Sequence, residues 1–170
     1  MKKTMQSQSR RHPLSKKQGG FSLPDFALWV VLAGGLILGL IQLYAMASGS
    51  LKEFQTTQAV NSLKAAAENV KIINHTGLSM TKVCDENRNA APKALCGEAR
   101  DGKGTNPYGG DYQLAPNSNF SLVDVTVTGI DTQYIDSIAD KLATMSSGNC
   151  ASFTGCSTIA LSGNNITVTL

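Results

Sequence analysis

The first apolar run of the chain is long enough to cross a lipid bilayer. No charged residue occurs from position 26 to position 51, and the centre of the run, residues 26–47, is rich in Leu, Val and Ile. A membrane-spanning helix needs roughly 20 consecutive apolar residues. The pattern therefore predicts a membrane-spanning helix close to the N-terminus.

Beyond that run, apolar residues recur at steps of three and four, which is typical of one buried face of a helix. Charged residues at positions 53, 64, 68 and 71 lie off this face. We therefore expect one helix from Phe21 to about Asn74, with a membrane-spanning half and an amphipathic half that packs on a head. The buried face is expected to comprise Thr56, Ala59, Leu63, Ala66, Val70 and Ile73.

After Gly77 the chain changes to short segments separated by turn residues. Alternating patterns predict strands at 112–114 and 121–128, and a terminal hairpin of 158–161 with 166–170. Asp131 is expected to cap a helix that ends before Gly148. The predicted fold class is α+β: a long N-terminal helix, with a membrane-spanning half and an amphipathic half, packed on a small antiparallel sheet head.

Charge is distributed unevenly along the chain. The formal net charge is +3 over 170 residues, but residues 1–20 carry six basic side chains and no acidic one. The remainder has nine basic and twelve acidic side chains. By the positive-inside rule the N-terminus stays in the cytoplasm and the rest is exported. A body with a net charge of −3 is a poor phosphate binder, so no direct nucleic-acid binding is expected.

The four cysteines all follow the apolar run, on the predicted exported side, where disulfides persist. Four cysteines allow three pairings, of which the local ones, Cys84–Cys96 and Cys150–Cys156, are favoured. Metal binding is the weaker alternative, because the chain has no C-x-x-C motif and few histidines. Neither a metal nor a cofactor is expected.

Three interpretations compete for the N-terminal segment. A cleaved secretory signal would end at Ala45-Met46-Ala47, an A-x-A sequence, although the apolar stretch exceeds the usual 7–15 residues. An uncleaved signal anchor explains the apolar run but not Asp25, because a carboxylate at the edge of a membrane span is costly and marks function.

The third interpretation accounts for the junction as a whole. Lys16-Lys17-Gln18-Gly19-Gly20 is followed by Phe21-Ser22-Leu23-Pro24-Asp25-Phe26. This sequence resembles the leader junction of type IV prepilins: a basic leader, a Gly before the cut, an aromatic or apolar first mature residue, and an acid at the fifth mature position. The family usually has Glu where this chain has Asp25. The 20-residue leader is more similar to the type IVb subgroup than to type IVa.

The resemblance implies a role for each matching position. The precursor would be cleaved between Gly20 and Phe21, Phe21 would be N-methylated, and Asp25 would neutralise the N-terminal amine of a neighbouring subunit during assembly. Pairing makes a carboxylate far less costly in an apolar environment. The implied organisation is a leader (1–20), a transmembrane and polymerisation helix (21–50), an amphipathic second half (51–76) and a disulfide-bonded head (77–170).

The same resemblance implies the partners and the location of the protein. These partners are other copies in a helical filament, prepilin peptidase and the inner-membrane pilus assembly machinery. The precursor would lie in the inner membrane with a periplasmic head, and the assembled pilus would be extracellular. Such filaments serve adhesion, motility, DNA uptake or conjugative mating. Type IVb pilins typically contain one longer bridge, which keeps a pairing of Cys84 or Cys96 with Cys150 or Cys156 open.

Motifs that carry catalysis are missing from the sequence: it has no G-x-S-x-G, H-E-x-x-H, Walker or GxGxxG pattern, so no enzymatic activity is expected. His75 is expected to act as a cation at a helix C-terminus. A calcium loop near Asp101 and Asp111 would favour the alternative of a type II secretion pseudopilin. The alternative from another class is a signal-anchored or secreted extracytoplasmic binding domain.

Overall fold

The computed structural model describes residues 23–170, so the expected cleavage and methylation site at Gly20 and Phe21 lies outside the described residues. Helix α1, Leu23–Val70, is 48 residues long. The chain divides into two compact units after Gln42, and the unit Leu43–Leu170 contains the second part of α1 and every other element. We refer to this second unit as the head.

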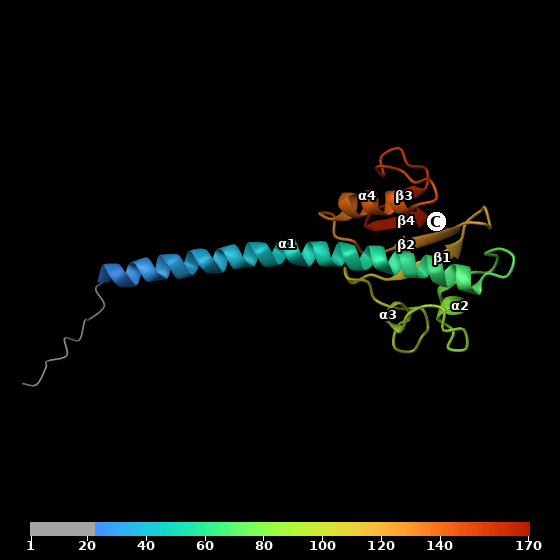
Figure 1. Cartoon of the computed structure of the whole chain (residues 1–170), viewed down its shortest axis with the longest axis horizontal. Helices are drawn as coiled ribbons and strands as arrows, with labels where there is room; N and C mark the ends of the chain where they lie inside the picture. The colour runs from blue at the N-terminus through green and yellow to red at the C-terminus, as the bar shows by residue number, and fades with distance from the viewer. Residues whose placement is uncertain (1–22) are drawn as a thin grey trace, which may run out of the picture. The chain divides into compact units, whose positions relative to one another are not determined.

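The sheet of the head has four antiparallel strands in the order β1-β2-β4-β3. They are β1 (Tyr112–Pro116), β2 (Val123–Val127), β3 (Ile159–Ser162) and β4 (Asn165–Thr169). The last strand of the chain, β4, lies between β2 and β3. Figure 1 shows the strands gathered beside the second part of α1, with α2 and α3 in the segment that connects α1 to the sheet.

One face of the sheet forms the core with α1 and helix α4, Ile135–Met145. Along β2 the valines are buried and the residues between them are half-buried, as the period of two in a strand requires. Across the sheet Val125 faces Val168 and Val127 faces Ile166, and all four are buried. On the opposite face the hydroxyls of Thr126 and Thr167 lie 2.8 Å apart. The α+β architecture expected from the sequence is confirmed.

Helix α1 ends earlier than the sequence predicted. The predicted face is buried from Thr56 to Val70, but Ile73 lies beyond the helix and is 87% exposed. The chain leaves the helix because the backbone N–H of His75 donates to the carbonyl of Phe120, 2.9 Å away. That bond ties the segment after α1 to the loop between β1 and β2, so the helical spacing of Ile73 was misleading.

Helix α4 also begins differently from the prediction. Its N-cap position is Tyr134, which makes no side-chain capping hydrogen bond, and the expected cap Asp131 lies one turn earlier. The carbonyl of Asp131 accepts a hydrogen bond from the N–H of Tyr134 at 2.9 Å. A turn therefore precedes the helix, and the prediction of Asp131 as the cap was wrong. Two short helices, α2 (Met80–Cys84) and α3 (Lys93–Cys96), were not predicted.

Candidate assembly surface

The first part of α1 carries an exposed apolar surface. Its large side chains, from Leu23 through Trp29 to Met46, are each more than half exposed. The only charged side chain there is Asp25, in the first turn of the helix. By length and composition this helix could cross a membrane, and a signal sequence near the N-terminus can have the same length and composition. We call residues 23–47 of α1 the apolar segment.

Burial of α1 begins at Gly49. A Cβ atom placed on Gly49 would lie 2.9 Å from Cε1 of Tyr134, so the ring of Tyr134 packs directly against the helix backbone. The ring of Tyr134 in turn lies 6.0 Å from that of Tyr108, and Nζ of Lys52 lies 5.3 Å from the centroid of the Tyr108 ring. A side chain at position 49 would occupy space that the ring fills, so the Tyr134 ring would have to move to admit it.

Glu53 links α1 to α4 in the same region. Its carboxylate is paired with the ammonium group of Lys141, and its side chain is 12% exposed. Burial raises the pKa of Glu53, but hydrogen bonds from Lys141 and Ser137 outweigh that effect, so the pKa lies below its ordinary value. The pair joins two helices that are far apart in the sequence. Sequence analysis placed Glu53 off the buried face but did not reveal its partner.

Two tyrosines, Tyr108 before β1 and Tyr112 at its start, complete the contact between α1 and the rest of the head. Burial, and then the negative charge of Glu53, raise the pKa of Tyr108. Burial likewise raises the pKa of Tyr112, partly offset by a hydrogen bond with Thr56. Gly49, Lys52, Glu53 and Thr56 on α1 thus face aromatic and polar groups of the head, and we call this set of contacts the helix junction.

The turn at 106–111, which the sequence marked as a loop, depends on the buried side chain of Asn106. Its amide nitrogen donates to the carbonyls of Asp111 and Thr128, at 3.1 and 2.6 Å. Its amide oxygen accepts from the N–H groups of Tyr108 and Gly110, at 2.9 and 3.1 Å. All four hydrogen-bonding positions of the amide are used. Asn106 therefore fixes the turn that carries Tyr108 into the helix junction.

The structure contains the two local disulfides that the sequence favoured. Cys84 is bonded to Cys96 with a Cα–Cα distance of 5.4 Å, and Cys150 to Cys156 with a distance of 5.9 Å. The longer pairing that the type IVb resemblance kept open is not present. The first bridge holds α2 to α3, and the second closes a loop between α4 and β3.

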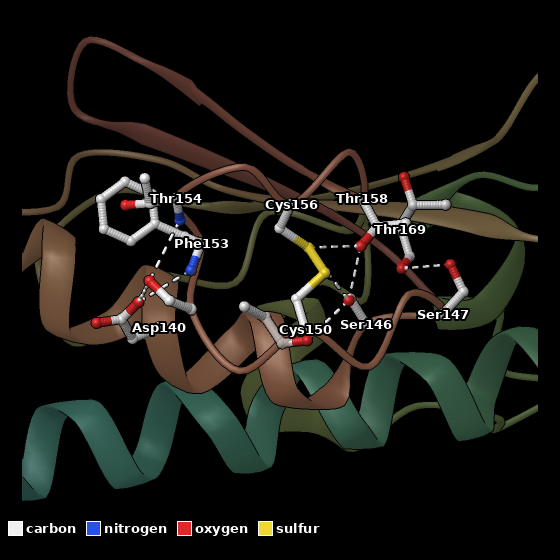
Figure 2. The surroundings of a disulfide bond; sticks show 11 residues. Asp140, Ser146, Ser147, Cys150, Phe153, Thr154, Cys156, Thr158 and Thr169 are labelled. Carbon is white, nitrogen blue, oxygen red and sulfur yellow. Dashed lines mark hydrogen bonds between the residues drawn. A yellow bond between two sulfur atoms is a disulfide. The ribbon is translucent and has the colours of Figure 1, made fainter.

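Figure 2 shows how the second loop is held between α4 and the hairpin. The carboxylate of Asp140 on α4 accepts hydrogen bonds from the N–H of Phe153 at 2.9 Å and from the hydroxyl of Ser152 at 2.8 Å. The Phe153 bond, followed by the Ser152 bond, holds the pKa of Asp140 below its ordinary value. On the other side of the loop Thr158 donates to Ser146 at 2.7 Å. Asp140 therefore holds the middle of the disulfide-closed loop, and the Thr158–Ser146 bond joins the chain on either side of it.

His75 does not lie at the end of α1, where the sequence placed it. It is buried, five residues past the end of α1. Its Nδ1 lies 3.2 Å from the carbonyl oxygen of Phe120, and its Nε2 lies 3.3 Å from Oε1 of Glu68. The predicted position was wrong because apolar residues continue at helical spacing past Val70, whereas α1 ends at Val70.

Within residues 23–170, no group of three or more His, Cys, Asp or Glu side chains is placed to hold a metal ion. Asp111 instead bonds to the hydroxyl of Thr128, and Asp101 accepts the N–H of Lys103 at 3.2 Å. Each of the two acids considered for a calcium loop thus has a local structural role.

The fold and this surface define a class of protein: a disulfide-bonded α+β head on a helix that could cross a membrane. Comparisons with protein-family models, with curated proteins and with solved structures find no match for this chain.

Proposed function

We propose that the chain is the structural subunit of a type IV pilus of the type IVb kind. It would be made as a membrane-inserted precursor, cleaved after Gly20 and polymerised through α1. The observation that carries the proposal is the apolar segment of α1. It is exposed along its length, its single charge is Asp25 in the first helical turn, and the same helix continues into the head.

Such a segment needs an apolar environment, because large exposed apolar patches on soluble proteins mark membrane or protein contacts. A bilayer supplies this environment for the precursor, and neighbouring copies of the helix supply it in a filament. The carboxylate of Asp25 would pair with the free amine of Phe21 on an adjacent copy, which reduces the cost of placing both charges in apolar surroundings.

The position of the acid also supports this proposal over a plain signal anchor. An anchor needs only apolar residues, whereas Asp25 lies at the fifth position after the proposed cut. Two disulfides in the head favour an exported pilus over a secretion pseudopilin. The filament would serve adhesion, motility, DNA uptake or conjugative mating.

The mass of the mature protein tests the proposal. We expect a chain that begins at Phe21, with or without a methyl group on its amine, and thin filaments in electron micrographs of the cell surface. A chain that begins at Ser48 would support a secreted domain, and an intact Met1 would support a signal anchor. Either result would overturn the pilus proposal.

A further inference from the structure

Strand β3 is a free edge of the sheet. Within residues 23–170 it pairs with β4 on one side only, because the strand order ends at β3. Three of its four residues, Ala160, Leu161 and Ser162, are exposed. A free edge presents unpaired N–H and C=O groups to any extended chain that can approach.

The two edges of the sheet differ in their protection. Strand β1 ends in Pro116, whose nitrogen has no hydrogen to donate, and α2 packs against β1. Strand β3 contains neither proline nor a charged residue. Charged side chains and proline are the usual means by which proteins prevent edge-to-edge pairing. The β3 edge has neither of these two protections.

The segments next to β3 in the sequence carry no charged side chain, and the charged groups nearest to the second disulfide loop come from α4, where Asp140 is bonded to Ser152 and Phe153. Lys141 is the last charged side chain of the sequence, so the second disulfide loop, β3 and β4 contain none. The net charge of −3 in the chain after residue 20 therefore lies entirely before position 142. Neither β3 nor its partner β4 therefore places a charged side chain at this edge, so repulsion between like charges on the strands does not oppose the approach of a second copy.

The hairpin register identifies which backbone groups point outward. The pair Ser162–Asn165 closes the two-residue turn, and Leu161 faces Ile166. In antiparallel pairs, hydrogen-bonded and non-hydrogen-bonded positions alternate from the turn. Leu161 is therefore a non-hydrogen-bonded position with respect to β4, and its N–H and C=O point to the free edge.

We propose that β3 pairs antiparallel with β3 of a second copy of this chain, around a two-fold axis at Leu161. Each Leu161 would donate its N–H to the carbonyl of the other Leu161, which forms the hydrogen-bonded pair at the centre of the contact. The two Leu161 side chains, each 40% exposed in a single copy, would then lie side by side on the same face. The contact joins heads that belong to different filaments or membranes.

The occupant is a second copy because an antiparallel edge is self-complementary. A two-fold axis brings identical donors and acceptors opposite each other, and isologous contacts of this kind are the commonest between copies of one chain. A contact of four residues is weak by itself, because each hydrogen bond replaces one made with water. Many copies displayed together convert this weak contact into a stable one. In that respect the inference rests on the proposed function.

The first test uses the full chain reconstituted through α1 into phosphatidylcholine vesicles, with clustering followed by light scattering. We expect wild-type vesicles to cluster, and Leu161→Lys to reduce clustering about tenfold or more, because two like charges would lie directly opposite each other. The matched control is Thr154→Lys, which adds the same charge to the uncharged region at an exposed residue outside β3. It should cluster like the wild type.

Salt provides a second readout in the same vesicles. A contact without charged side chains should be nearly unchanged between about 0.05 M and about 0.5 M salt, whereas ionic contacts are screened in this range. Dispersed wild-type vesicles, or equal clustering of the Leu161→Lys variant, would overturn the proposal.

The register is tested by cross-linking, since the described chain has no free cysteine. Leu161→Cys should give disulfide-linked dimers in membranes under mild oxidation, because the two residues face each other. Ala160→Cys, the neighbouring exposed position, would lie opposite Ser162 of the other copy and should stay monomeric. Equal cross-linking of the two variants contradicts the register. Neither experiment needs leader cleavage or filaments, so both are informative even where the pilus proposal fails.

Discussion

Asp25 is the single charged residue within an otherwise apolar surface, and its position was evident from the sequence alone. Its proposed partner, the amine of Phe21 on a neighbouring copy, could be predicted only from the resemblance of the leader junction. The structure places Asp25 in the first turn of α1. A carboxylate there also interacts favourably with the helix dipole, so the two roles must be separated by experiment.

Substitutions at Asp25 separate its proposed role in assembly from its interaction with the helix dipole. Asp25→Asn should leave leader cleavage intact but reduce filament yield about 100-fold, because breaking a buried pair of charges costs about 3 kcal/mol or more. Immunoblots of sheared surface fractions measure the yield, and the mass of the membrane-bound chain reports cleavage. Asp25→Glu should retain most of the yield. An Asp25→Asn variant that assembles normally would contradict the assembly role.

Gly49 is a residue whose importance the sequence did not reveal. In the sequence it resembles the other glycines of the apolar region, Gly34, Gly35 and Gly39. In the structure those three have open space around the position of a Cβ atom, whereas Gly49 is covered by Tyr134. Only the fold reveals this difference, because the partner comes from a segment 85 residues later in the sequence.

Replacing these glycines by alanine should therefore change the stability of the protein differently at Gly49 and at Gly39. Gly49→Ala should destabilise the head by about 1–3 kcal/mol, because the added methyl group displaces the Tyr134 ring. Gly39→Ala should be neutral, or stabilising by up to about 1 kcal/mol through its helix propensity. Thermal unfolding of the detergent-solubilised chain compares the two. Equal effects would show that Tyr134 moves aside without cost.

Helix α1 was predictable as an element because two signals agree along it, a long apolar run followed by apolar residues at helical spacing. Its end was not, because the bond between His75 and Phe120 is a contact between distant parts of the chain. Helices α2 and α3 were missed for a related reason. They have five and four residues, too short for a helical period to emerge, and a disulfide holds them together.

The link between α1 and α4 through Glu53 and Lys141 predicts a dependence on pH. Folding lowers the pKa of Glu53 below its ordinary value of 4.5. The stabilisation is therefore fully present above about pH 4.5 and is lost as the pH falls through the folded-state value. Asp140, whose pKa is lowered from 3.8, adds to the same trend at slightly lower pH.

We expect the melting temperature of the head to fall between about pH 5 and pH 3. Glu53→Gln should lower the melting temperature at pH 7 and make the decline below pH 5 shallower, since only Asp140 of the two then titrates. The control is Glu98→Gln, at a side chain that is 93% exposed, which should decline like the wild type. A Glu53→Gln curve parallel to the wild type would exclude the link as a source of pH dependence.

At the scale of the whole molecule, the sequence predicted the class of fold, the sheet hairpin and the local cysteine pairs. It could not predict that β4 lies between β2 and β3, because strand order depends on long-range pairing rather than local pattern. The helix junction was missed for the same reason: Tyr108, Tyr134 and Lys141 come from three separate segments. Their burial against α1 is a property of the packed head.

Net charge is a whole-molecule property that cleavage would reverse. The chain has a net charge of +3 and an isoelectric point near 8.7. Removal of residues 1–20 leaves nine basic and twelve acidic side chains. We expect the mature protein to focus in the acidic range and a Gly20→Val variant to remain basic, because a side chain at the cut should block the peptidase. Isoelectric focusing of membrane fractions measures both. A basic wild-type band would contradict cleavage at this position.

The continuity of α1 has a mechanical consequence. A pull on the apolar segment reaches the head through the helix itself, at the buried residues between Gly49 and Val70. Neither disulfide includes a residue of α1, so non-covalent contacts hold the helix in the head, spread over about six helical turns. Resistance to force is governed by the rate of unfolding rather than by equilibrium stability. The length of helix held in the head would therefore determine how long a subunit withstands tension before its helix slides out.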